Sequence, residues 1–313
     1  MSRIAEGKGA LPLNDSNAVR CFSYVTIDVF TTTRFGGNPV AVFFPAVGLS
    51  DDEMQALAAE MNYSETTFVL PPSDPANQAR VRIFNRTAEM PFAGHPNVGT
   101  AFALAAANPD LPNTLRFEEE AGLVSVRLLR SSSNEIVGAE IDAPQPLQRL
   151  GIVPAEAVAA CAGLAEDDVV VTAHQPTRAS VGIDFVLAQV QPEALGRAVP
   201  DLAAFRSAAR DHAGASGRLS LFLYARDQEQ VRARMFAPLA GTWEDAATGS
   251  ANAALAALLL DVDGGDSLSF ETMQGVEMGR PSLLRLRAQK AADGIRASIG
   301  GECVPVFRGT VEL

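Results

Sequence analysis

Three side chains have the chemistry to move protons, and each stands beside a turn or at the end of a strand. Glu65 lies in Ser-Glu-Thr-Thr-Phe, at the start of an otherwise apolar predicted strand. Burial there would raise the pKa of its carboxyl group and suit it to proton transfer. His95 follows Gly94 in the predicted first turn of a helix, and Asp245 precedes a similar turn. These three residues are the candidates for acid–base chemistry.

Each candidate also has a plain structural alternative. Glu65 could be an exposed carboxylate at the end of a strand, and His95 could be a capping or packing histidine. Asp245 and its neighbour Glu244 could simply complement the partial positive charge of a helix N-terminus. Because two adjacent acids point in different directions, one of them can still face a cleft.

The surroundings of His95 and Asp245 are repeated within the chain. Glu-Met-Pro-Phe-Ala-Gly-His-Pro-Asn at 89–97 returns in altered form as Glu-Asp-Ala-Ala-Thr-Gly-Ser-Ala-Asn at 244–252. Gly94 aligns with Gly249 and His95 with Ser250, an offset of 155 residues (249 − 94). Further matches, of 81–84 with 233–236 and of 115–122 with 268–275, have offsets of 152 and 153. The repeat predicts a duplicated protein with two similar halves.

Each repeated turn precedes an Ala-rich, nearly uncharged segment, at Val98 to Ala107 and Ala253 to Leu260. Such segments are typical of helices that are buried on all sides. The N–H groups at the start of a helix are unpaired and bind anions. Two such ends facing each other would bind the carboxylate of a small substrate. The residues predicted to bind substrate are Asn38, Gly94, Thr248, Gly249 and Ser250.

The elements that must position these residues have a mixed pattern. Ser50 to Glu53 form a capping box before a helix, and short alternating strands flank most helical segments. The pattern predicts an α+β fold, with a curled, mostly antiparallel sheet around a central helix in each half. Pro144-Gln145-Pro146 is the predicted linker between the halves, which leaves a loose tail over residues 1–20.

Composition excludes several classes of function. The 313 residues carry a formal net charge of −12, so no nucleic-acid or anionic-membrane partner is expected. No apolar run is long enough for a membrane span. Three scattered cysteines indicate buried thiols in a reducing, cytoplasmic setting. No Cys or His pair has metal-ligand spacing and no phosphate-binding glycine motif occurs, so neither a metal nor a nucleotide cofactor is expected.

Taken together, these motifs resemble the PhzF-like isomerase family of phenazine biosynthesis, which is related to the diaminopimelate epimerase fold. The resemblance runs from about Val25 to Arg308 and is carried by five segments, which are DVFTTTRFGGNPVAVF, NYSETTFVLP, EMPFAGHPNVGTA, WEDAATGSANAALA and MQGVEMGRPS. It implies two epimerase-like domains, with the active site in the cleft between them. We expect one domain over 21–143, joined by a terminal strand at 303–313, and the other over 147–302. The resemblance also implies an enzyme that needs no cofactor or metal and forms a homodimer.

Matched to the family motifs, the catalytic glutamate falls on Glu65, the histidine on His95 and the aspartate on Asp245, while Ser250 matches the family's serine. Ala246 departs from the pattern, because the family usually has proline there. The related cysteine epimerases carry a thiol in each glycine turn, and the absence of cysteine near either turn disfavours that chemistry.

The resemblance leaves three functions open. The first is an isomerase that moves a proton along a small unsaturated carboxylic acid, similar to a dihydro-hydroxyanthranilate. The second is an epimerase or racemase of a small amino or hydroxy acid, and the third is a non-catalytic protein that binds a small anion. A pure binding protein needs the glycine turns but no acid for proton transfer, so the three candidate residues argue against it.

Overall fold

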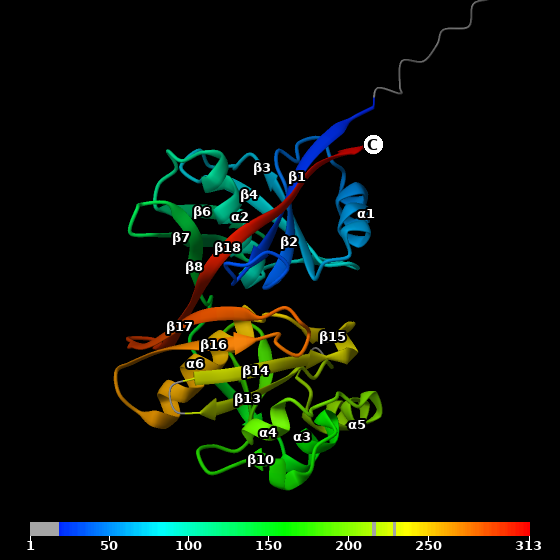
Figure 1. Cartoon of the computed structure of the whole chain (residues 1–313), viewed down its shortest axis with the longest axis vertical. Coiled ribbons are helices and arrows are strands. Elements are labelled where there is room, and N and C mark those ends of the chain that lie inside the picture. The colour runs from blue at the N-terminus through cyan, green and yellow to red at the C-terminus, as the bar shows by residue number, and fades with distance from the viewer. Residues whose placement is uncertain (1–18, 215–216, 228–229) are drawn as a thin grey trace, which may run out of the picture.

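The chain folds into two lobes that meet at a seam, as the computed structural model shows for residues 19–214, 217–227 and 230–313 (Figure 1). Residues 1–18 of the expected tail lie outside the described residues. We call the lobe built from β1 to β8 the N-lobe and the lobe built from β9 to β17 the C-lobe. The two chain ends of the described part lie close together, since Arg20 and Leu313 exchange backbone hydrogen bonds of 2.9 Å in both directions.

The N-lobe is mostly strands, with one helix on its outside and one at its centre. Its elements are β1 (Cys21–Val29), β2 (Asn38–Phe43), α1 (Asp51–Met61), β3 (Glu65–Leu70), β4 (Ala79–Phe84), β5 (Glu89–Met90), α2 (Gly94–Ala107), β6 (Thr114–Glu119), β7 (Gly122–Arg130) and β8 (Ile136–Asp142).

The C-lobe repeats this plan with extra helices at the far end of the molecule (Figure 1). Its elements are β9 (Gln148–Ile152), α3 (Ala155–Ala162), η1 (Glu166–Asp168), β10 (Val169–Val170), β11 (Thr177–Ser180), β12 (Asp184–Val190), α4 (Pro192–Leu195), α5 (Leu202–His212), β13 (Leu221–Asp227), β14 (Gln230–Ala237), η2 (Pro238–Ala240), β15 (Thr242–Asp245), α6 (Gly249–Asp263), β16 (Ser267–Gln274) and β17 (Ser282–Ala291).

Strand pairing follows the same sequence of directions in both lobes. In the N-lobe, β2 pairs with β3 in parallel, β3 with β4 antiparallel, and β4 with β6 in parallel. In the C-lobe, β12 pairs with β13 in parallel, β13 with β14 antiparallel, and β14 with β16 in parallel. The predicted α+β class is therefore confirmed, with mostly antiparallel sheets in two lobes of similar plan.

The central helices α2 and α6 start at the two glycines that the repeat aligns. Most of their residues are buried on every side, as the absence of charged residues from Val98 to Ala107 and from Ala253 to Leu260 predicts. α2 packs against β1, β2 and β8, and α6 packs against β16, β17 and β18. Each sheet curls around its helix, so the start of the helix is fixed at the seam.

The last strand, β18 (Gly294–Glu312), belongs to both lobes. Its first part pairs with β17, its middle with β8, and residues 303–312 pair with β1. Figure 1 shows it running from the lower lobe into the upper one. β18 therefore ties the two lobes together along its 19 residues.

Two details differ from the sequence interpretation. β9 was not predicted, because Gln148 to Ile152 is exposed along its length and lacks the alternation of a half-buried strand. The expectation of buried thiols is wrong for Cys21, which is exposed on β1, whereas Cys161 and Cys303 are buried and free. In the part of the chain that the structure describes, no helix is long and apolar enough to cross a membrane.

Candidate active site

A cavity of about 460 Å³ opens along the seam, and both lobes line it. The lining residues of the N-lobe are Ser64, Glu65, Asn85, Arg86, Thr87, Met90, Phe92, Ala93, Gly94 and His95. Those of the C-lobe are Gly182, Ile183, Asp184, Phe185, Arg218, Ser220, Met235, Ala237, Ala240, Gly241, Thr242, Asp245, Ala247, Thr248, Gly249 and Ser250. We call this cavity the cleft. It contains every predicted site residue except Asn38.

The two glycine turns touch at the inner end of the cleft. A Cβ atom on Gly94 would lie 4.0 Å from the Cα atom of Gly249, which is van der Waals contact. A Cβ atom on Gly249 would lie only 2.3 Å from Cδ1 of Ile299, which packs behind both glycines. Glycine avoids this overlap at position 249, and the N-termini of α2 and α6 face one space. Backbone N–H groups in this arrangement can bind a carboxylate.

Glu65 and His95 face each other in the cleft. Oε2 of Glu65 lies 3.5 Å from Nε2 of His95, and both side chains are largely buried. Burial raises the pKa of Glu65 to about 7, against smaller effects of Ser64 and Arg86 that lower it. Burial also lowers the pKa of His95 to about 4, against the charge of Asp245 and a backbone hydrogen bond at Pro39. Between about pH 4 and 7 the proton therefore resides on Glu65 and the imidazole is neutral.

Asp245 is the second acid of the cleft and comes from the other lobe. Its carboxylate accepts hydrogen bonds from Nδ2 of Asn38 at 2.9 Å and from Oγ1 of Thr248 at 2.7 Å. Burial and the nearby charge of Glu65 raise its pKa to about 6, while His95 and the two hydrogen bonds oppose the increase. Glu65 and Asp245 thus titrate near neutrality in one cavity, which is the usual environment of acid–base residues.

Asn38 lies behind Asp245 and not on the cavity wall. Its Nδ2 also donates to the Ala247 carbonyl at 2.9 Å, and its Oδ1 accepts from Ser64 at 3.2 Å. All of these partners lie beside or within the cleft. Asn38 therefore links the two lobes beside the cleft through these hydrogen bonds, and its contact with substrate stays a prediction.

Gln274 is a site residue that sequence reasoning missed. Its Oε1 accepts from the Thr248 backbone N–H and from Nδ2 of Asn252, and its Nε2 donates to the Asp245 carbonyl and to Oγ1 of Thr248, with distances of 2.8 to 3.1 Å. The side chain is fully buried. It fixes the turn that carries Asp245 and starts α6. The signal was available, since Gln274 directly precedes Gly275, one of the glycines of the repeat.

Glu244 is held in an ion pair, a structural role other than the expected complement to a helix N-terminus. Arg234 donates to both of its oxygens, at 2.8 and 2.9 Å, and Arg82 does the same to Glu89 in the N-lobe, at 2.7 and 2.6 Å. Both glutamates precede the glycine turns at matching positions. These ion pairs hold the turns in place, so Asp245 is the acid of the adjacent pair that reaches the cleft.

Ser220 takes the position of Glu65 in the other lobe. Glu65 directly precedes Thr66, which pairs with Phe84, and Ser220 directly precedes Leu221, which pairs with Phe236. Both residues line the cleft. The offset of 155 that aligns the two glycines also aligns Glu65 with Ser220, so this correspondence could have been found from the sequence. One lobe therefore presents a carboxyl group where the other presents a hydroxyl group.

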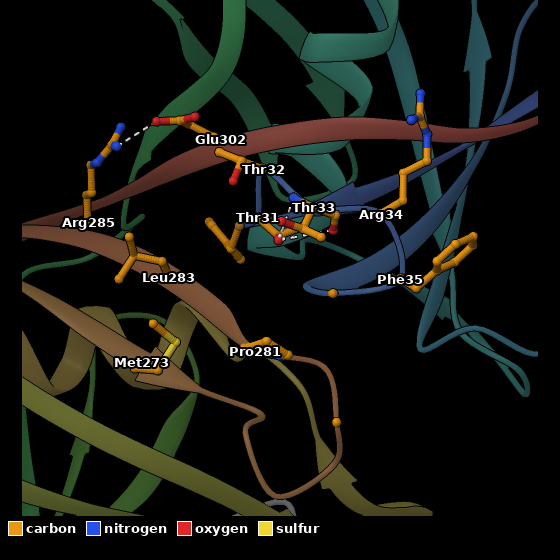
Figure 2. Close-up of a pocket in the computed structure, with 13 residues that line it drawn as sticks. Thr31, Thr32, Thr33, Arg34, Phe35, Met273, Pro281, Leu283, Arg285 and Glu302 are labelled. Atoms are coloured by element: carbon orange, nitrogen blue, oxygen red, sulfur yellow. Dashed lines mark hydrogen bonds and ion pairs between the residues drawn. The ribbon is translucent and has the colours of Figure 1, made fainter.

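A second cavity, of about 540 Å³, lies between Thr31 to Gly36 and the strands β16 to β18 (Figure 2). Arg285 and Glu302 form an ion pair of 2.7 Å along its wall. None of the predicted site residues lines this cavity. Across the described ranges, no group of three or more His, Cys, Asp or Glu side chains could hold a metal ion.

Comparisons with known proteins agree with this geometry. A family model described as phenazine biosynthesis-like protein matches residues 27–309. A trans-2,3-dihydro-3-hydroxyanthranilate isomerase of Pseudomonas chlororaphis is 36% identical over 298 residues, covering 93% of this chain and 99% of its own. An uncharacterised isomerase of Mesorhizobium japonicum is 39% identical over 301 residues, covering 92% of this chain and 97% of its own.

Among solved structures, a phenazine biosynthesis protein of the PhzF family from Bacillus anthracis superposes with a TM-score of 0.82. Its sequence identity is 24%, and the match covers 93% of this chain and 99% of the other, so it supports the fold. The family model and the two relatives match nearly the whole chain, and both relatives are named as isomerases. The chain therefore belongs to the PhzF-like phenazine biosynthesis family, and it is an isomerase.

Proposed function

We propose that the chain is a cofactor-independent isomerase that moves a proton along a small unsaturated carboxylic acid in the cleft. The observation that carries this proposal is the buried Glu65, which faces His95 at 3.5 Å in a cavity lined by two helix N-termini. A carboxyl group whose pKa lies near neutrality can take a proton from one carbon and return it to another. The substrates of the Pseudomonas relatives, dihydro-hydroxyanthranilates, are acids of this class.

In this mechanism Glu65 removes a proton from one carbon of the substrate and the adjacent double bond shifts. Glu65 then donates a proton, which can exchange with solvent while Glu65 carries it, to the far end of the shifted system. No atom is gained or lost. The N–H groups around Gly94 and Gly249 bind the substrate carboxylate and stabilise the negative charge that develops on it. Neutral His95 and Asp245 orient the substrate beside Glu65.

The epimerase alternative is weaker because the C-lobe lacks a matching base. Inversion by direct proton transfer needs one acid–base group on each face of the same carbon. Ser220 occupies the position that corresponds to Glu65, and a serine hydroxyl does not ionise near neutral pH. A carboxyl group at only one of these two matching positions favours movement of a proton over one face.

Solvent-deuterium labelling of a panel of small carboxylic acids tests the proposal. An isomerase places deuterium on a new carbon, an epimerase labels the original carbon, and a binding protein labels none. Deuterium on a new carbon, lost in Glu65→Gln, is the expected result. Labelling confined to the original carbon would overturn it. The homodimer, the cytoplasmic location, the domain boundaries and the absence of nucleic-acid partners stay predictions.

A further inference from the structure

The side chain of Arg86 reaches across the rim of the cleft. Arg86 lies on the short loop between β4 and β5, and its Nη2 donates to the carbonyl of Gly241 at 3.2 Å. Gly241 lies on the matching loop of the C-lobe, between β14 and β15. Both residues line the cleft, and the neighbouring Thr87 and Gly241 are exposed. The guanidinium group is thus placed where a ligand enters.

The loop that carries Arg86 is held in shape. Oδ1 of Asn85 accepts from the backbone N–H groups of Thr87 and Ala88, both at 2.8 Å. The Asn85 carbonyl in turn accepts from Nε2 of Gln55 on α1 at 3.0 Å. Because the turn is braced on both sides, the Arg86 side chain begins from a fixed point. Because the backbone that carries Arg86 is already fixed, less conformational entropy is lost when a ligand binds to the side chain.

Arg86 has spare capacity to bind an anion. Within the described residues it has one hydrogen bond, to Gly241, and no carboxylate within ion-pair distance. Its positive charge acts on Glu65. A guanidinium group can donate two parallel hydrogen bonds to a carboxylate, which makes it selective for that group.

We infer that Arg86 binds a second acidic group of the substrate, so that the acid on which this enzyme acts is a small unsaturated dicarboxylate. The inference rests on the proposed function, in which the first carboxylate binds at the glycine turns. Those turns lie at the buried inner end of the cleft, and Arg86 lies at its exposed rim. Two anion-binding positions at different depths fit an acid with a carboxyl group at each end.

The test compares glutaconate with its monoamide. In glutaconate a proton can leave the methylene carbon beside one carboxyl group and return to the vinylic carbon beside the other, so solvent deuterium reports each turnover. We expect the parent protein to label glutaconate with a kcat/KM roughly 10- to 100-fold above that for the monoamide, the range of one charge-assisted contact. Arg86→Met should lose this preference by slowing only the dicarboxylate, and Arg86→Lys should retain part of it.

Arg34→Met is the matched control. Arg34 also donates to a backbone carbonyl, that of Pro305 at 2.9 Å, but it lines the other cavity (Figure 2). Arg34→Met should leave the preference for glutaconate over its monoamide unchanged. Equal kcat/KM for the two acids in the parent, or an equal loss for both in Arg86→Met, would overturn the inference and leave the proposed function standing.

Calorimetry of glutaconate binding separates the remaining case. If neither acid is labelled but glutaconate binds roughly 10- to 100-fold more weakly to Arg86→Met than to the parent, the inference about Arg86 holds. In that case the proposed proton transfer fails for this class of acid. Binding that is the same in parent and Arg86→Met would overturn the inference.

Discussion

The two lobes share their supporting contacts and differ in their chemistry. Arg82 and Arg234 occupy matching positions, pair with matching glutamates, and lie over matching phenylalanine rings at 5.1 and 4.9 Å from the ring centroids. The differences are concentrated at the cleft. Glu65 corresponds to Ser220, His95 to Ser250, and Met90 to Asp245, since Met90 pairs with Ile83 as Asp245 pairs with Met235.

This distribution separates what holds the site from what reacts in it. Contacts that fix the two helix N-termini are needed in both lobes, because both turns must meet at one space. Groups that transfer protons need not be doubled, because a proton that moves over one face requires one base. The following predictions test this division by changing a residue in one lobe together with its counterpart in the other.

Replacing the single base should have the largest effect. Glu65→Gln keeps the shape of the side chain but removes its transferable proton, so kcat should fall by roughly 10² to 10⁴-fold. Ser220→Ala, the matching change in the C-lobe, should alter kcat by less than about threefold, well below the effect of losing a general base. Steady-state turnover on an acid identified by deuterium labelling measures both. An equal loss in the two variants would remove the distinction between the lobes.

The parent enzyme should lose activity in acid because Glu65 must be ionised to remove a proton. Its pKa of about 7 predicts that kcat/KM falls about tenfold for each pH unit below that value. Asp245, with a pKa of about 6, shares the cavity, so the apparent value belongs to the pair. A profile of kcat/KM from pH 5 to 9 measures this apparent pKa. A constant rate down to pH 5 would show that no group with a raised pKa acts as the base.

The orienting residues should matter less than the base. Asp245→Asn and His95→Asn should each slow turnover by less than roughly 10²-fold, the lower limit expected for a general acid–base group. Met90 and Ser250 are the counterparts of Asp245 and His95 in the opposite lobes. Met90→Leu and Ser250→Ala should therefore slow turnover less than Asp245→Asn and His95→Asn. Comparison of kcat across the four variants decides the order. If Asp245→Asn proved slower than Glu65→Gln, Asp245 would become the candidate base.

The two glycines should differ in their tolerance of a methyl group. Gly249→Ala places Cβ 2.3 Å from Cδ1 of Ile299, whereas Gly94→Ala places it 3.2 Å away. We therefore expect Gly249→Ala to lower the free energy of unfolding by about 1–3 kcal/mol, the range for overpacking, and Gly94→Ala to lower it less. Urea unfolding measures the difference. In an Ile299→Val background both losses should shrink if this contact is the cause.

A further effect should depend on pH. Both carboxylate oxygens of Glu119 are buried without a hydrogen-bond partner among the described residues, and burial raises its pKa to about 8, against an opposing effect of Asn97. Since the folded pKa lies above the unfolded one, the stability it provides is complete below about pH 4 and is lost as pH rises to about 8.

Glu119→Gln should remove this loss, because glutamine does not titrate, and should be more stable than the parent at pH 8.5 by at least about 1 kcal/mol. Gln274 supplies the comparison, since it meets Asn252 in the C-lobe as a neutral amide. Urea unfolding at pH 5 and 8.5 measures the change. An unchanged difference between parent and variant at the two pH values would show that Glu119 is ionised throughout.

The repeated motifs predicted the starts of both central helices because glycine turns and Ala-rich runs are local signals. The family resemblance implied that Glu65, His95 and Asp245 lie in one cleft, and all three line it. β9 could not be predicted, because its pairing with β11 depends on a partner distant in sequence and its residues are exposed.

The supporting residues were harder to predict than the reactive ones. Gln274, Asn38 and Arg86 act through hydrogen bonds to backbone groups in loops, and the residue type alone does not indicate such partners. Ser220 was a different kind of omission. Ser220 follows Glu65 by the offset of the repeat, so the correspondence could have been found. A serine alone does not indicate a site, however, and becomes informative only when the matching position is known to hold an acid.

The path of β18 has a consequence for synthesis of the chain. The N-lobe leaves the ribosome first, yet β1 and β8 both pair with β18, which is made last. Until then, two strands of the nascent lobe have unpaired edges, which are the positions where chains associate wrongly. The lobe that is translated first is therefore completed last, and these strand edges stay open to wrong pairing until the final residues emerge.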